Sequence, residues 1–203
     1  MIDILRGLTP SFFVDEIKYK SIFLTEKECF TISNFVLKNE QKIKSLGPDC
    51  YGGTPDDSLT GRYYLFNYLN VPEINSILKP KLQNLFAELD LASEIYVQCW
   101  ANTFRKGDYI DPHRHAGESE EFLSANIFLK GRVEPGTTYH TDTGLVDLKN
   151  TVGELVLFDS STVHSVKEYQ YDDIRVTLAM DIHYGVGNMR FIFKNHPERY
   201  YKF

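Results

Sequence analysis

The chain has 203 residues, and its 22 Lys plus Arg against 28 Asp plus Glu give a formal net charge of −6. This length favours a single domain, residues 1–203, with one core. The acidic balance argues against non-specific binding to nucleic acid or to an anionic membrane. Three widely spaced cysteines without a Cys-x-x-Cys pair predict neither a disulfide framework nor a thiolate zinc site. With no signal-peptide pattern and no membrane-length apolar run, the expected location is the cytoplasm.

Residues 1–93 are predicted to form a helical support region. Thr25 and Glu28 make the Ser/Thr-x-x-Glu capping box that opens helices, and apolar residues then recur at helical spacing until Gly47 and Pro48. Gly, Pro and Asp residues between positions 49 and 61 predict a surface loop.

A second helix is predicted after this loop. Asn70 and Pro72 suit its N-cap and first turn, because a proline at the first helical position leaves no N–H unpaired. Pro80 lies inside the apolar periodicity of this helix. We therefore expect a kink or a break there.

From residue 94 onward the apolar spacing changes from helical to strand-like, with turn residues between short β-rich runs. Helices followed by strands predict the α+β class, with a sandwich or jelly-roll barrel over residues 94–184. The tail, residues 185–203, is expected to pack on this barrel. The predicted strands are residues 95–104, 121–130, 137–140, 145–148, 154–158, 163–169 and 174–184.

The histidines fall within and after this predicted barrel. His113 and His115 are separated by one residue, so both side chains point to the same face of an extended backbone. His164 begins a later predicted strand, and Arg175 lies at the start of the last one. Three ligands on one face of a jelly roll leave open positions on an iron ion, and a fixed arginine binds a carboxylate bidentately. The six histidines are His113, His115, His140, His164, His183 and His196.

Six short runs occur in order along this part of the chain: Trp100–Tyr109, Pro112–His115, Ser124–Leu129, Gly153–Phe158, His164–Val166 and Arg175–Thr177. This series resembles the iron(II)/2-oxoglutarate oxygenases related to prolyl hydroxylases. The resemblance implies a double-stranded β-helix that binds iron(II) and 2-oxoglutarate. It also implies a dioxygenase that uses molecular oxygen to hydroxylate a C–H bond of a peptidyl or small-molecule, proline-like substrate.

The resemblance assigns roles to individual residues. His113, His115 and His164 would bind iron(II), and Arg175 would bind the distal carboxylate of 2-oxoglutarate. Thr177 lies two residues further along the strand, on the same face, and would donate its hydroxyl to that carboxylate. The usual first motif is His-x-Asp/Glu, so His115 in the third position leaves the site one negative charge short.

A second departure concerns the contact to 2-oxoglutarate. Phe128 lies at a strand position where relatives tend to have tyrosine, so a hydroxyl contact is missing. Ser124 and Asn126 share its face and would substitute for that contact.

Alternatives stay open at this point. The third ligand could be an acidic residue, Asp111, Glu118, Glu120 or Asp142, instead of His115. A rival triad of His140 and Asp142 with His164 restores His-x-Asp, but its members are too close in sequence for the intervening strands. The chain could also be a cupin-like three-histidine metalloenzyme without 2-oxoglutarate, or a non-catalytic jelly roll that serves as a binding or assembly module. Arg175 distinguishes these functions, because only an enzyme that uses 2-oxoglutarate needs an arginine at this position.

Overall fold

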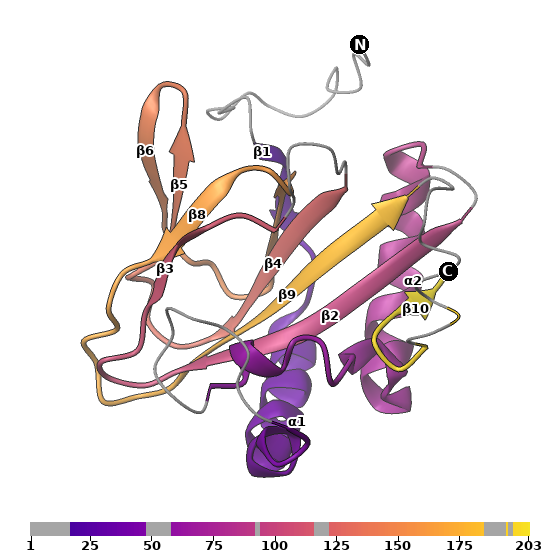
Figure 1. Cartoon of the computed structure of the whole chain (residues 1–203), viewed down its shortest axis with the longest axis horizontal. Helices are drawn as coiled ribbons and strands as arrows, with labels where there is room; N and C mark the ends of the chain where they lie inside the picture. Colours follow the sequence, from indigo (N-terminus) through magenta and orange to yellow (C-terminus); the bar gives the residue numbers. More distant parts are fainter. Residues whose placement is uncertain (1–16, 48–57, 92–93, 116–121, 185–193, 195–196) are drawn as a thin grey trace.

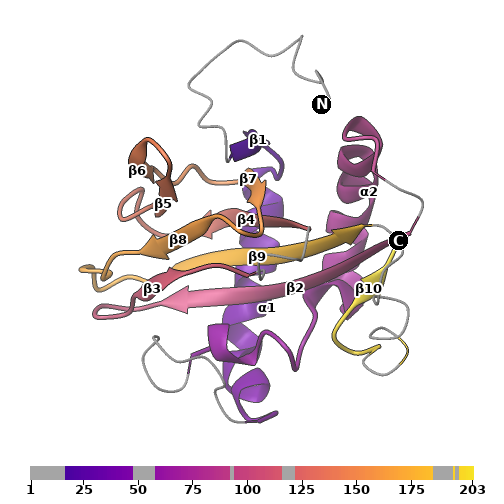
Figure 2. The ribbon, with the colours of Figure 1, turned by 45° about the horizontal axis from the view of Figure 1, so that its top comes forward.

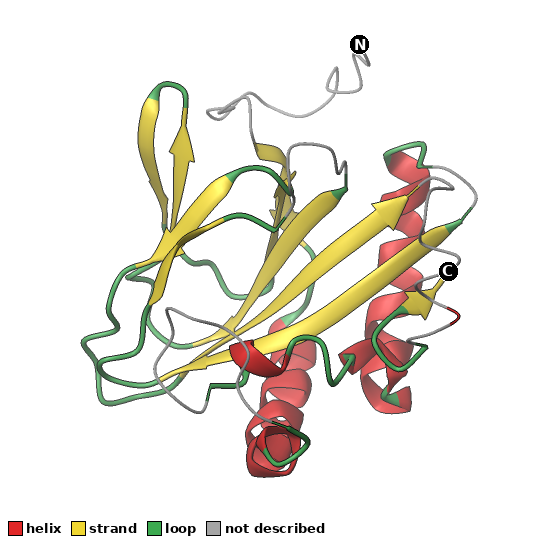
Figure 3. Cartoon of the chain, viewed as in Figure 1, coloured by secondary structure: helices red, strands yellow, loops and turns green. Residues whose placement is uncertain are grey.

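The computed structural model describes residues 17–47, 58–91, 94–115, 122–184, 194 and 197–203 (Figure 1). The molecule combines two long helices with two antiparallel sheets (Figure 3). The elements are β1 (Ile17–Ile22), α1 (Glu26–Lys44), the 3-10 helices η1 (Thr60–Arg62) and η2 (Tyr68–Asn70), α2 (Pro72–Glu88), β2 (Ile95–Phe104), β3 (Ile110–His113), β4 (Leu123–Lys130), β5 (Thr137–Thr141), β6 (Gly144–Leu148), β7 (Glu154–Asp159), β8 (Val163–Val166), β9 (Arg175–Tyr184) and β10 (Tyr201–Lys202).

The strands form two antiparallel sheets. The larger sheet has the order β1-β7-β4-β9-β2-β10, and the smaller has the order β3-β8-β5-β6. Apart from the β5–β6 hairpin, neighbouring strands come from parts of the sequence that are far apart. This hairpin extends away from the rest of the molecule (Figures 1 and 2). This arrangement confirms the α+β class. In the described part of the chain, no helix is both long and apolar enough to cross a membrane.

The central strands of the larger sheet are buried on both faces, and the two faces differ in chemistry. Because side chains alternate along a strand, every second residue of β9 packs against the helices in the main apolar cluster. The intervening residues face the smaller sheet and include the polar side chains Arg175, Thr177 and Asp181. The apolar cluster contains Val176, Leu178, Met180 and Ile182 of β9, Ile32 and Val36 of α1, and Leu78 and Leu82 of α2.

The helix predictions are largely confirmed. The Thr25–Glu28 capping box opens α1, with both reciprocal hydrogen bonds present. Helix α2 begins at Pro72, but its N-cap is Val71, because the Asn70 amide donates to the Glu198 carbonyl instead. The expected break at Pro80 is wrong: α2 continues through this residue, and the buried side chains of its apolar face anchor the helix to the sheet on both sides of the proline.

Six of the seven predicted strands agree with the structure within two residues, whereas the strand expected over 163–169 ends at Val166. Three strands were not predicted. In β1, which is half exposed, lysines alternate with less polar residues. Strand β3 has only four residues and includes Pro112, and β10 has only two residues. Each is too short or too polar to give a periodic signal, and pairing with a neighbouring strand decides its conformation. Much of the loop predicted over 49–61 lies outside the described residues.

Candidate metal centre

The structure brings three histidines together between the two sheets. His113 ends β3 and lies opposite His164 of β8 in the strand pairing, and His115 follows two residues after His113. One ligand nitrogen from each ring lies within 4.8 Å of the others. The Nε2 atoms of His113 and His115 are 3.3 Å apart, close to the separation of about 3 Å expected for two nitrogens bound at right angles about 2.1 Å from one metal ion.

Hydrogen bonds hold all three rings in the orientation that a metal needs. His113 Nδ1 donates to the Asp111 carbonyl at 2.9 Å, and His164 Nδ1 donates to the Thr162 carbonyl at 3.0 Å. His115 Nδ1 contacts the Asp181 carboxylate at 2.6 Å. With the proton on Nδ1, the lone pair of each neutral ring lies on Nε2. The Nε2 atoms can therefore act as the three ligands.

The surroundings of the three rings shift their pKa values in different directions. Desolvation lowers the pKa of His113 to about 4, and it holds the pKa of His164 well below the usual range. Burial acts in the same direction on His115, but the charge and hydrogen bond of Asp181 outweigh it and raise the pKa of His115. His113 and His164 are thus neutral at pH 7, the form that binds metal.

Asp181 is the residue of this centre that the sequence interpretation missed. It lies on β9, is only 8% exposed, and accepts a hydrogen bond from the Ser124 hydroxyl at 2.8 Å. Ser124 Oγ is also 3.1 Å from His115 Nδ1. The Ser124 hydroxyl therefore contacts both the Asp181 carboxylate and the His115 ring. The sequence could have indicated Asp181, because it lies an even number of residues after Arg175 and Thr177 and so falls on the same face of that strand.

Arg175 lies on the same face of β9 and is almost fully buried, at 2% exposure. Its guanidinium packs over the rings of Phe104 and Phe128, 5.0 and 5.8 Å from their centroids. Within the described residues it forms no ion pair, its Nε has no hydrogen-bond partner, and its contact to Asn150 Oδ1 is 3.5 Å long. Desolvation lowers the pKa of Arg175 to about 10. A buried cation without an anion is costly, and a ligand carboxylate would fit this position.

The neighbouring polar residues have defined partners. Thr177 Oγ1 accepts a hydrogen bond from the Asn102 amide at 3.2 Å, so its own proton stays available to a ligand. Asn126 donates to the Tyr139 hydroxyl at 2.9 Å. A small cavity is lined by Asn126, Phe128, Tyr139 and Asn150 among other residues, and two of these, Phe128 and Asn150, also contact Arg175.

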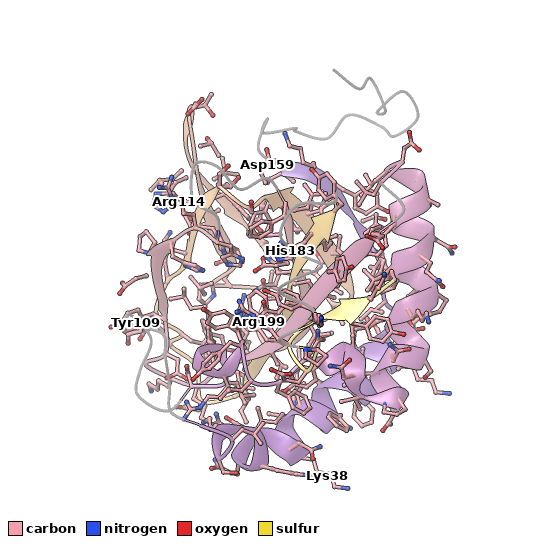
Figure 4. The ribbon with its side chains drawn as sticks, turned by 45° about the vertical axis from the view of Figure 1, so that its right-hand side comes forward. Lys38, Tyr109, Arg114, Asp159, His183 and Arg199 are labelled. Carbon is pink, nitrogen blue, oxygen red and sulfur yellow. The ribbon has the colours of Figure 1, made fainter. Side chains whose placement is uncertain are left out.

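The alternative ligands lie elsewhere or outside the described residues. The side chains of Asp111 and Asp142 are exposed, and His140 contacts Ser165 at 3.4 Å and is absent from the histidine cluster. Glu118 and Glu120 lie outside the described residues. Arg114, between the two histidines in sequence, is exposed, and Figure 4 shows it at the edge of the molecule.

Comparison with known proteins identifies the fold. No family model and no curated protein matches the chain. Solved structures do match. A prolyl-4-hydroxylase from Pseudomonas putida aligns with TM-score 0.60 and 13% identity over 83% of this chain and 92% of that one. The viral collagen prolyl hydroxylase of Paramecium bursaria Chlorella virus-1, in a 2-oxoglutarate complex, aligns with TM-score 0.60 and 14% identity over 83% and 97% of the two chains.

The chain has the fold of the prolyl hydroxylases. A third match is a prolyl hydroxylase from Trichoplax adhaerens in complex with a peptide fragment of the hypoxia-inducible factor oxygen degradation domain. It aligns with TM-score 0.60 and 13% identity over 86% of each chain. The resemblance found in the sequence is therefore confirmed at the level of the fold.

Proposed function

We propose that this protein is an iron(II)- and 2-oxoglutarate-dependent dioxygenase that hydroxylates a C–H bond. The observation that carries the proposal is a juxtaposition on one face of the large sheet. One nitrogen from each of three histidines lies close to the other two, beside Asp181 of β9. At the start of β9 lies the buried Arg175, which forms no ion pair among the described residues. The first group fits a metal ion, and the second fits the carboxylate of a ligand that reaches between them.

His113, His115 and His164 would hold iron(II) through neutral imidazole nitrogens. Three ligands on one face leave the opposite positions open to a chelating keto acid and to oxygen. A bound iron(II) would activate molecular oxygen, the oxidant, so that one oxygen atom would enter succinate as 2-oxoglutarate loses carbon dioxide and the other would enter the substrate C–H bond. The three outer hydrogen bonds fix the rings in position.

Arg175 and Thr177 would bind the distal carboxylate of 2-oxoglutarate. The guanidinium supplies a planar pair of donors that matches a carboxylate, and the Thr177 proton supplies a further donor. Phe104 and Phe128 shield the guanidinium from water, which strengthens its attraction for an anion. The hydroxyl that relatives provide at position 128 is missing here, and Asn126 lines the cavity beside it.

We further propose that the two sheets form a double-stranded β-helix, supported on its outer face by α1 and α2. The alternation of buried apolar and polar residues along β9 supports this arrangement. The substrate would be peptidyl or a small molecule. A peptide fragment occupies the Trichoplax enzyme structure, and a proline-like substrate rests on this likeness alone.

Arg175 favours this function over a cupin-like metalloenzyme that works without 2-oxoglutarate. Such an enzyme has no use for a buried guanidinium that forms no ion pair within the described part of the chain, because an uncompensated buried charge destabilises the fold. A purely structural jelly roll likewise has no use for three inward-facing imidazoles whose outer nitrogens are all engaged.

The decisive experiment measures binding before turnover. The protein is reconstituted without oxygen with iron(II), and 2-oxoglutarate binding is followed by titration calorimetry. Oxygen is then admitted and succinate is measured. We expect binding of 2-oxoglutarate that requires the metal, and slow succinate formation without added substrate. H164A should lose the metal and R175M should lose 2-oxoglutarate while keeping the metal. Wild-type protein that binds iron(II) but not 2-oxoglutarate would refute the proposal.

A further inference from the structure

The three-histidine face raises a question of charge. A face of two histidines and one carboxylate brings one negative charge to an iron(II) ion. Here His115 occupies the carboxylate position, so the ligands themselves bring none. A centre that binds a dication with neutral ligands in a buried site lacks a charge that would stabilise the ion.

The outer partners of the three rings are not alike. His113 and His164 donate to backbone carbonyls. His115 alone contacts a carboxylate, Asp181, at 2.6 Å. The ring that replaces the usual acid is therefore the ring that carries an acid behind it.

The fold fixes this carboxylate in place. Ser124 of β4 and Asp181 of β9 are paired directly across the sheet, and the Ser124 hydroxyl donates to the same carboxylate oxygen that His115 contacts. Asp181 is nearly buried, and within the described residues it has no lysine or arginine partner. Its direct partners are the Ser124 hydroxyl and the His115 ring, so the charge of the carboxylate acts on the ring that would bind the metal.

We propose that Asp181 is a positioning residue. Through its hydrogen bond with His115, it would supply the negative charge that the three ligands lack. The inference rests on the proposed function. Asp181 keeps the proton of His115 on Nδ1, directs Nε2 at the metal, and makes that nitrogen a stronger donor. Ser124 aims the carboxylate at the ring. The charge of a His-x-Asp face is thus kept but moved out of the coordination shell.

The test separates charge from shape. D181N has the same size and keeps an oxygen that accepts from His115 Nδ1, so it removes only the charge. Manganese(II) is titrated into metal-free protein at fixed pH, and thermal unfolding of the metal-free protein checks the fold. We expect D181N to bind manganese(II) about 10- to 100-fold more weakly than wild type. The matched control S124A removes one hydrogen bond to the carboxylate and keeps the charge, and it should weaken binding only a few-fold.

In protein that carries H115D, the same D181N change should have the opposite effect on manganese(II) affinity. H115D returns a carboxylate to the coordination shell and places it beside Asp181, so two like charges compete in a buried site. D181N added to H115D should therefore strengthen manganese(II) binding relative to H115D alone. This double variant also carries the test if D181N by itself does not fold.

The outcomes distinguish the two proposals. Wild-type protein that binds no manganese(II) or iron(II) would overturn the proposed function. A metal-binding wild type with an unchanged affinity in folded D181N would overturn the role of Asp181 and leave the function standing. Equal losses on adding D181N to wild type and to H115D would show that Asp181 acts through the fold alone, which also overturns the inference.

Discussion

Arg175 gives the sharpest prediction, because its proposed role in binding and its effect on stability have opposite signs. R175M replaces the buried guanidinium with an unbranched apolar side chain that is shorter than arginine. We expect this variant to lose 2-oxoglutarate binding and, in the absence of ligand, to be more stable than wild type. The stability gain arises because the fold no longer holds an unpaired cation.

The magnitude follows from the pKa. Burial lowers the pKa of Arg175 from 12.5 to about 10, which at about 1.4 kcal/mol per tenfold change corresponds to a cost of about 3 kcal/mol for the charged form. Arg175 is charged at pH 7 in both folded and unfolded protein, so the whole cost falls on the folded state. The lost contacts with Phe104 and Phe128 offset about 1 to 2 kcal/mol. The free energy of unfolding should rise by about 1 to 2 kcal/mol.

The assay is urea denaturation at pH 7 with and without manganese(II) plus 2-oxoglutarate. Wild type should gain stability from the ligands together beyond the gain from the metal alone, whereas R175M should gain only the metal contribution. R132M is the matched control: Arg132 is 61% exposed and pairs with Asp173 at 3.1 Å, so its replacement should change stability by less than about 1 kcal/mol. A ligand-free R175M that is less stable than wild type, or one that still binds 2-oxoglutarate, would refute the reasoning.

Three further predictions concern the support of the site and of the fold. G131A should cost about 1 to 3 kcal/mol more than G144A, because both glycines have positive φ, +120° and +127°, but only at Gly131 would the new Cβ lie 2.8 Å from a neighbouring Cα, that of Arg175; chemical denaturation compares them. H164A should weaken manganese(II) binding more than about 100-fold in calorimetry, and H140A should leave it unchanged. Burial would raise the pKa of Glu40, but the hydrogen bonds and charges of Arg105 and Lys44 lower it to about 2. Glu40 should therefore contribute about 3 kcal/mol above pH 4.5 that is lost as the pH falls toward 2, and E40Q should flatten this acid dependence in denaturation curves recorded from pH 7 to 2.

Each of these predictions has an outcome that contradicts it. Equal losses in G131A and G144A would mean that backbone strain, and not the approach to Arg175, sets the cost. A metal affinity that falls in H140A as much as in H164A would favour the rival triad. An unchanged acid dependence in E40Q would show that the Glu40 ion pair has no net effect on folding between pH 4.5 and 2.

Elements with a local signal could be predicted from the amino-acid sequence alone. Helix α1 follows from its capping box and apolar spacing, and β2 and β9 follow from long runs with strand periodicity. The short strands β1, β3 and β10 gave no such signal, because partners far along the chain hold them in the sheets.

The candidate site divides in the same way. His113, His115, His164 and Arg175 could be named from the sequence, since their spacing and neighbouring motifs resemble a known pattern. Three further features are visible only in the folded protein: Asp181 contacts His115, Ser124 donates to the same carboxylate, and Arg175 has no ion-pair partner among the described residues. These facts depend on strand register and on the packing of one sheet against the other. Local periodicity fixes which face a side chain takes, but it does not fix which distant residue it meets there.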